Sequence, residues 1–251
     1  MNIRQRLGNR LANFLSAPST RDVWPATCTP EVLASTIRKG DVLLVEGSSR
    51  FSVAIKYLTQ STWSHSALCI ADLDDDDYEG VQLIEADVSK GVIILPLERY
   101  TDFHTRICRP VGLHPEDIEK VVQHIRNRLG HQYDLRNVFD LMRYLIRTPP
   151  VPRKWRRRLL SLGSGDPTRA ICSTLIAAAF QSVRYPILPE IKMEKIGDGH
   201  YDSYDEMLHI RHHSLFAPRD FDISPYFEIV KPSLHKGFDP YALTWAKQEV
   251  V

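Results

Sequence analysis

The sequence predicts an α+β fold. Two observations predict it. Short apolar segments with strand character follow one another at residues 41–46, 64–71, 81–88, 91–97 and 105–109. Two longer segments with the apolar spacing of helices come after them, at residues 114–130 and 168–183. Strands in one run and helices in another are typical of this class.

The composition is that of an ordinary folded protein and excludes several classes. The 251 residues are 43% hydrophobic and 25% charged, with a net charge of +1, so neither a disordered chain nor a uniformly basic nucleic-acid binder is expected. No apolar run approaches the roughly 20 residues of a membrane span, and the start lacks the apolar core of a secretory signal. The four cysteines are widely spaced, with no CxxC pair, so we expect no disulfide and a cytoplasmic location, either free or associated with a membrane surface. The sequence has no HExxH motif, no Cys/His pair at ligand spacing and no Walker or dinucleotide glycine motif, so no metal and no cofactor are expected.

The N-terminal region is expected to precede the main domain. Residues 2–15 predict a short basic amphipathic helix, which either packs on the main domain or contacts a membrane surface or a partner. After a linker, Thr29 and Pro30 mark the start of a second short helix, which is expected to end at Gly40. The expected organisation is an N-terminal region at 1–37, a main domain at 38–232 and a C-terminal extension at 233–251.

Local signatures support the remaining elements. The acidic run at 72–80 does not have the ligand spacing of a calcium loop, so it predicts a solvated loop between the second and third strands. Pro115 opens the helix at 114–130 and Gly130 closes it. The other expected elements are helices at 50–59 and 135–147 and a strand at 227–230.

Cys172 is the candidate nucleophile. It falls in the first turn of the helix at 168–183, where the helix macrodipole and unpaired backbone N–H groups lower the pKa of a thiol. The backbone N–H of Cys172 is the natural donor to an oxyanion. An inert, buried cysteine is the alternative interpretation.

His65 and Glu85 lie in two strands that are expected to pair as a hairpin. In an even-sum register, such as 65 opposite 85 or 65 opposite 87, their side chains share a face with Cβ atoms about 4.5–8 Å apart. A slip by one residue places them on opposite faces. Asp87 has the same parity as Glu85 and is a rival for its role. A cysteine, a histidine and a carboxylate form a set of nucleophile, base and orienting group.

Four motifs contain these candidates: Gly40-Asp-Val-Leu-Leu-Val-Glu46, Ser61-Thr-Trp-Ser-His65, Ile84-Glu-Ala86 and Ala170-Ile-Cys-Ser-Thr174. Together they resemble the circularly permuted papain-like cysteine hydrolases, the YiiX/YebB-like branch of the NlpC-type superfamily, which is related to the lecithin:retinol acyltransferases. The likeness covers roughly residues 38–232, including Pro218–Pro225. It implies a circularly permuted papain-like fold, in which an antiparallel sheet or partial barrel packs against the helix that carries the nucleophile. It also implies Cys172 as nucleophile, His65 as base and Glu85 as orienting residue.

Further positions are candidates for substrate contact. Trp63 belongs to one of the motifs, and Tyr133 and Asp134 follow the helix at 114–130 in a context that resembles the family. We expect these three residues to line the substrate site, although Tyr133 packed on the core is an equal alternative. Glu46, at the end of the first strand, either faces the cleft or is a solvated strand end.

The expected chemistry is acyl transfer through a thioester, on an amide or ester bond. The segment from residue 136 to residue 169 contains nine Lys and Arg residues but only two Asp residues, so it is strongly basic. The segment at 153–160, together with 2–15, predicts peripheral contact with an anionic membrane and hence a lipid or lipid-linked substrate. A solvated helix face or an RNA-binding patch is the alternative for the basic segment.

Small-molecule, lipid or peptide substrates are the expected partners, and no specific nucleic acid is expected. Two other functions remain open on the same fold. One is a peptidoglycan-peptide hydrolase with the same mechanism. The other is a non-catalytic module that binds membranes or nucleic acid.

Overall fold

The computed structural model describes residues 25–75, 79–87, 90–131, 172–196, 203–209, 216–232 and 241. The predictions for the helix at 2–15, the helix at 135–147 and the basic segment at 153–160 concern residues outside this part of the chain. The same holds for the C-terminal extension at 233–251, apart from Tyr241.

Six antiparallel strands form one open sheet in the order β4-β3-β2-β1-β5-β8. The predicted α+β class is confirmed, because helices accompany an antiparallel sheet rather than connecting parallel strands. The predicted hairpin pairing of the second and third strands is also present. The strands are β1 (Val42–Val45), β2 (His65–Ala71), β3 (Gln82–Asp87), β4 (Gly91–Pro96), β5 (Thr105–Pro110) and β8 (Phe227–Val230).

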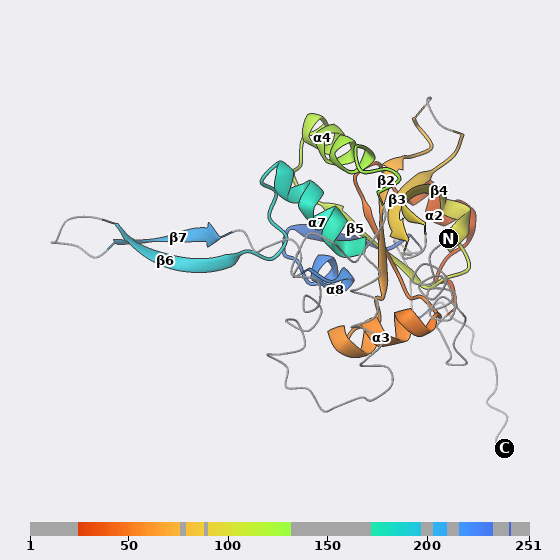
Figure 1. Cartoon of the computed structure of the whole chain (residues 1–251), viewed down its shortest axis with the longest axis horizontal. Coiled ribbons are helices and arrows are strands. Elements are labelled where there is room, and N and C mark those ends of the chain that lie inside the picture. Colours follow the sequence, from red (N-terminus) through yellow and green to blue (C-terminus); the bar gives the residue numbers. More distant parts are fainter. Residues whose placement is uncertain are drawn as a thin grey trace, which may run out of the picture.

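Helices cover both faces of the sheet. Figure 1 shows α4, α7 and α8 on one side of it, α2 on the other, and α3 below the strands. Within the described ranges, the helices are too short or too polar to cross a membrane. Their bounds are α2 (Pro30–Thr36), α3 (Arg50–Thr59), the 3-10 helix η1 (Leu97–Tyr100), α4 (Pro115–Arg126), α7 (Cys172–Ser182) and α8 (Pro218–Asp222).

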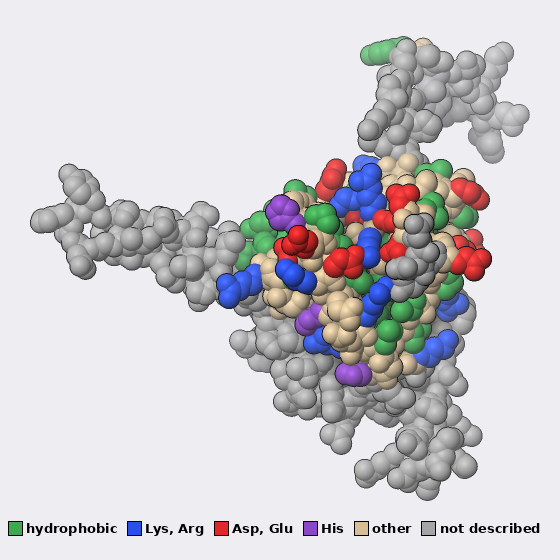
Figure 2. Space-filling view, turned by 90° about the horizontal axis from the view of Figure 1, so that it is seen from above, with side chains coloured by type: hydrophobic (Ala, Val, Ile, Leu, Met, Phe, Trp, Pro, Cys, Tyr) green, Lys and Arg blue, Asp and Glu red, His purple; other side chains and the backbone are tan. Residues whose placement is uncertain are grey.

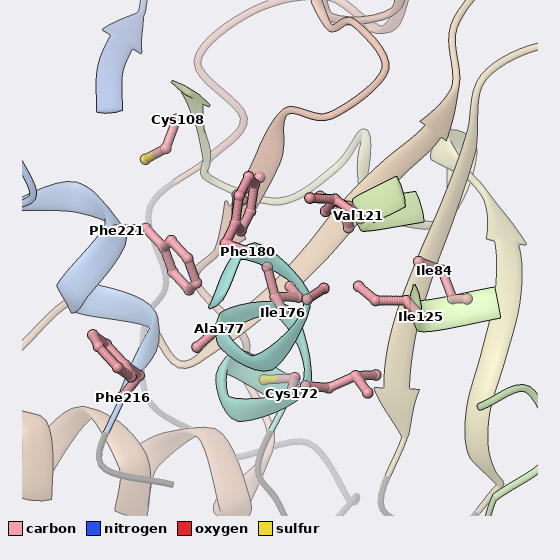
Figure 3. Packing of buried hydrophobic residues seen from close by; sticks show 14 of the residues in the cluster. Ile84, Cys108, Val121, Ile125, Cys172, Ile176, Ala177, Phe180, Phe216 and Phe221 are labelled. Atoms are coloured by element: carbon pink, nitrogen blue, oxygen red, sulfur yellow. The ribbon is translucent and has the colours of Figure 1, made fainter. Parts of the chain in front are cut away.

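Two apolar clusters form on the two faces, because successive residues of a strand point to opposite sides. Leu44, Leu68 and Ile84 belong to the cluster shared with α4, α7 and α8. Figure 3 shows Ile84 of this cluster beside Ile125 of α4. The second cluster joins the opposite face to α2 and η1. β1 is buried along its whole length since both of its faces are covered.

The beginning of α7 is held firmly in place. Ala177 and Ala179 are fully buried, and their small side chains allow the helix to lie close to its neighbours. The Ser173 hydroxyl donates to the carbonyl oxygen of Phe216 at 2.8 Å, just before α8. These contacts fix the end of α7 that carries Cys172.

The short helix expected near residue 30 packs against the sheet. Its cap is the predicted one, because the Thr29 hydroxyl accepts a backbone N–H of the first turn at 3.4 Å. α2 ends at Thr36 rather than at Gly40. The reason is that Ile37 leaves the helix in an extended conformation and is buried in the second cluster.

Sequence analysis does not predict the hairpin of β6 (Glu190–Ile196) and β7 (Ser203–His209), which projects from the body of the molecule (Figure 1). β6 is rich in Glu, Lys and Met, which favour helices. It does not predict η1 or α8 either, because about one turn of helix has no apolar period to detect.

Charges of both signs are mixed on the face seen in Figure 2. At physiological salt, the field of each surface charge is screened within about 8–10 Å, and neighbouring charges of opposite sign offset each other. The described part of this face therefore presents no extended patch of one sign to a charged partner.

A buried ion pair joins α2 to the sheet. Asp41 is 1% exposed, and its two carboxylate oxygens accept hydrogen bonds from Arg109 Nε at 2.9 Å and Nη2 at 2.7 Å. Arg109 Nη2 also donates to the carbonyl oxygen of Thr36 at 2.8 Å, at the end of α2. Burial raises the pKa of the Asp41 carboxyl, and the guanidinium opposes that rise.

Replacing Asp41 with alanine is expected to lower the free energy of unfolding by about 3 kcal/mol, because it leaves the Arg109 guanidinium largely buried without its partner. Urea unfolding followed by circular dichroism measures the change. The control is Asp117→Ala, which removes an ion pair with Lys120 at the surface and should have a much smaller effect. Equal losses in the two variants would contradict this account.

Candidate active site

The beginning of β2 lies beside the end of β1, which in turn lies beside the beginning of β5. Val45, the last residue of β1, pairs with His65 of β2 on one side and with Thr105 of β5 on the other. The residues that end β1 and begin β2 and β5 therefore lie side by side at one end of the sheet. This end carries the histidine that sequence analysis selects.

The register between β2 and β3 is of the even-sum kind, one of the two kinds that the sequence left open. Leu68 pairs with Ile84, which is an even-sum register. His65 and Glu85 therefore share a face of the sheet, and it is the face opposite to that of Leu68 and Ile84. The prediction that parity brings these two residues together is confirmed by their contact.

Glu85 holds the His65 ring. The distance between His65 Nε2 and Glu85 Oε2 is 2.7 Å, and the Tyr100 hydroxyl donates to the same carboxylate oxygen. The Tyr100 and His65 rings lie 5.8 Å apart between centroids. The rival carboxylate of Asp87 accepts the backbone N–H of Lys90 at 2.8 Å. Because Nε2 faces Glu85, Nδ1 is the ring nitrogen left to serve a thiol.

Cys172 is the first residue of α7 in the described part of the chain, and its thiol is paired with His65. Burial acts to raise the pKa of this thiol, but the charge and hydrogen bond of His65, with a smaller contribution from Ser66, outweigh it and lower the pKa. Burial acts to lower the pKa of the His65 imidazole. The charges and hydrogen bonds of Cys172 and Glu85 outweigh burial and raise this pKa well above its usual value. The pair therefore favours thiolate and imidazolium.

The carboxylate is ionised as well. Burial acts to raise the pKa of Glu85, but the His65 charge, its hydrogen bond and the Tyr100 hydroxyl outweigh burial and lower it. The pKa of Tyr100 is raised, first by burial and then by the Glu85 charge, so its hydroxyl keeps its proton. Tyr100 is therefore a donor to an ionised Glu85.

The Cys172 thiol is more buried than a fully open nucleophile would be. Cys172 is 4% exposed, whereas the His65 side chain is 21% exposed. Solvent thus reaches the imidazole more readily than the sulfur. A substrate carbonyl must displace part of what covers the thiol before it can contact it.

The other three cysteines differ from Cys172 in the direction in which their surroundings shift the thiol pKa. Burial raises the pKa of Cys28, Cys69 and Cys108. Among the four cysteines of the chain, Cys172 alone has a lowered pKa. This difference separates a thiol at a helix start beside a cation from thiols in an apolar core.

Trp63 lies in the core rather than on an open surface. It is 3% exposed, and its indole N–H donates to Asp222 Oδ2 at 2.9 Å. His104 and Arg106 pack against its ring, each at 5.0 Å. Its role in substrate contact stays a prediction, and this burial does not favour it. Its visible contribution is to connect α8 to the beginning of β2.

Glu46 is neither a solvated strand end nor an unpaired carboxylate in a cleft. It is 5% exposed, and it contacts Lys56 Nζ at 2.9 Å and His104 Nδ1 at 3.1 Å. The expectation of a solvated position is therefore wrong. A carboxylate that two cationic or hydrogen-bonding groups surround can stay buried at a strand end.

Tyr133 and Asp134, the other predicted substrate contacts, lie outside the described residues. The sequence does not predict that Tyr100 contacts the site, and it assigns no role to Ser66. The serines beside His65 are visible in the sequence, but nothing local marks Tyr100, which reaches Glu85 only through the fold.

In the part of the chain that the structure describes, no group of three or more His, Cys, Asp or Glu side chains is arranged to hold a metal ion. A scan against protein-family models gives no match, and a search of curated proteins gives none either. Among solved structures, the chain is similar to the metalloprotein YiiX from Escherichia coli O157:H7. The two share 17% sequence identity with a TM-score of 0.49, over 78% of this chain and 97% of that one.

Iodoacetamide at pH 6 is expected to modify Cys172 faster than Cys28, Cys69 or Cys108, because alkylation needs the thiolate. Mass spectrometry of peptides after a short reaction measures each site. His65→Ala should slow modification of Cys172 at least about tenfold, since loss of the cation raises the thiol pKa by about one unit or more. Equal modification of all four cysteines would refute the ion pair.

Proposed function

We propose that this chain is a thiol-dependent hydrolase or acyltransferase of the circularly permuted papain-like class, with Cys172, His65 and Glu85 as its triad. The observation that carries the proposal is a thiol paired with an imidazole whose other side is held at 2.7 Å by a buried carboxylate. This set of nucleophile, base and orienting group performs covalent acyl transfer on several unrelated folds. The motifs that resemble the YiiX/YebB-like branch support the same assignment.

Acylation begins from the ion pair. The Cys172 thiolate attacks the carbonyl carbon of an amide or ester, a C–S bond forms, and the carbonyl π electrons move to oxygen. Backbone N–H groups in the first turn of α7, including that of Cys172, are the donors we assign to this oxyanion. When the carbonyl re-forms, the bond to the leaving amine or alcohol breaks, and the His65 imidazolium gives that group its proton.

Deacylation runs the same steps with a second nucleophile. Neutral His65 takes a proton from water, or from an acceptor alcohol or amine, as that group attacks the thioester carbonyl. The C–S bond breaks, and the thiolate returns beside the imidazolium. Water gives hydrolysis, whereas another acceptor gives acyl transfer. Glu85 stays ionised throughout, stabilises the imidazolium and fixes the orientation of the ring.

The acyl donor we propose is a lipid or a lipid-linked molecule. Its support is the sequence, in which basic segments at 2–15 and 153–160 accompany the triad and suit an anionic membrane surface. A peptidoglycan peptide is the competing substrate for the same chemistry. A binding module without catalysis would bind membranes or nucleic acid and form no acyl-enzyme.

Incubation with candidate acyl donors is expected to add one acyl group to Cys172, and the mass added identifies the substrate class. Intact-mass spectrometry after an acid quench measures this directly. Phospholipid vesicles and purified peptidoglycan fragments are the two donors to compare. Cys172→Ala should form no adduct, and His65→Ala should lose it because the thiolate is no longer populated. The matched control Cys28→Ser should retain it.

Transfer from peptidoglycan alone would assign the competing substrate. No adduct from either donor, or from a small activated ester such as p-nitrophenyl acetate, would contradict the proposed chemistry. Adduct formation that survives in Cys172→Ala would contradict the choice of nucleophile.

Replacing Glu85 with glutamine should shift the alkaline limit of activity to lower pH. Activity needs the imidazolium and is lost as the pH rises through the raised pKa of His65. The Glu85 charge contributes to that rise, so its removal should lower the alkaline midpoint of kcat/KM by about one unit. Hydrolysis of p-nitrophenyl acetate across the pH range measures it. Glu98→Gln, the same change at an exposed site of η1, should leave the profile in place.

A further inference from the structure

The hydroxyl of Ser66 is buried beside the candidate nucleophile. Ser66 is 0% exposed, and its Oγ has no hydrogen-bond partner in the described structure. A buried hydroxyl without a partner is uncommon in folded proteins, because it loses its hydrogen bonds to water and gains none in return. A native structure that retains such a group calls for a physical explanation.

The position of Ser66 in β2 directs it towards α7. It pairs across the sheet with Leu44, and both share the parity of Leu68, whose side chain belongs to the cluster that α7 covers. His65, one residue earlier, has the opposite parity and contacts Glu85. Two consecutive residues of β2 therefore present different groups to the beginning of α7.

We propose that Ser66 is a positioning residue whose hydroxyl donates a hydrogen bond to the Cys172 thiolate, beside the imidazolium of His65. This inference rests on the proposed function, because it concerns the state of its nucleophile. It also accounts for the partnerless hydroxyl, since a thiolate accepts hydrogen bonds more strongly than a neutral thiol does. The Ser66 backbone N–H contributes to the same anion.

The role of this hydrogen bond is to hold the reactive form of the sulfur and fix its direction. When the thiolate attacks a carbonyl, its electron pair enters the C–S bond and the hydrogen bond weakens. Ser66 therefore favours the resting ion pair and contributes little to later steps. The titratable groups that influence this thiol from the packed elements are His65 of β2 and, through it, Glu85 of β3 and Tyr100 of η1.

Two matched serines make the inference testable. Ser66→Ala removes the hydroxyl, and Ser66→Thr keeps one at the same position. Ser224→Ala is the control, because Ser224, which follows α8, is also buried, but its hydroxyl donates to the carbonyl oxygen of Ile187 at 2.5 Å. The measurement is the rate at which iodoacetamide alkylates Cys172 as a function of pH, with the thermal midpoint of each variant recorded alongside.

Ser66→Ala is expected to raise the pH midpoint of Cys172 alkylation by about one unit, which makes the reaction about tenfold slower well below the midpoint. Ser66→Thr should return the midpoint towards that of the unaltered protein. Ser224→Ala should keep the midpoint of alkylation but lower the thermal midpoint, because it removes the buried hydrogen bond between the Ser224 hydroxyl and the carbonyl oxygen of Ile187. Ser66→Ala should not lower the thermal midpoint to the same extent.

An unchanged alkylation midpoint in Ser66→Ala would overturn this inference, and so would an equal shift in Ser224→Ala. Failure of the proposed function looks different. In that case neither candidate donor nor p-nitrophenyl acetate would acylate Cys172 in the unaltered protein, whatever the alkylation midpoints of the serine variants.

Discussion

An imidazolium at the end of a sheet needs opposite charge close to it, and this requirement organises the whole candidate site. His65 has the Glu85 carboxylate at 2.7 Å on one side and the Cys172 sulfur on the other. Each of these groups is costly to bury in its charged form, and each is stabilised by its neighbour. The Tyr100 hydroxyl adds to the same arrangement by donating to the carboxylate where water would otherwise donate. Removing any one of these charges therefore makes the ionised forms of the other groups less stable.

The sheet meets this requirement by placing the histidine at the first position of a strand. Glu85 and η1 lie on the face that α2 also covers, whereas α7 covers the opposite face. A histidine in the middle of β2 would be separated from one of its two partners by the sheet itself. His65, at the end of the sheet, contacts groups from both sides. The tie between Ser173 and Phe216 then keeps the beginning of α7 at that end.

A second polar group supports the same end of the sheet without belonging to the triad. Lys56 of α3 and His104 both contact the buried carboxylate of Glu46, which follows β1. These contacts attach α3 to the sheet just before the segment that leads to His65. Trp63, in that segment, is held in turn by Asp222 of α8. The segment between α3 and His65 is therefore held in place by two separate sets of hydrogen bonds and ion pairs.

The amino-acid sequence by itself determined the six strands of the main sheet and the pairing of β2 with β3, because alternation and turn signals act over a few residues. The structure fixed the even-sum register that brings His65 and Glu85 to one face, since the sequence also allowed a slip by one residue. Only the tertiary structure decided between Glu85 and Asp87, since two residues of equal parity differ in nothing that a local pattern records. It also decided that Tyr100 donates to the carboxylate and that Trp63 is buried. These outcomes depend on strand twist and on the packing of segments far apart in the chain, and no short stretch of sequence contains that information.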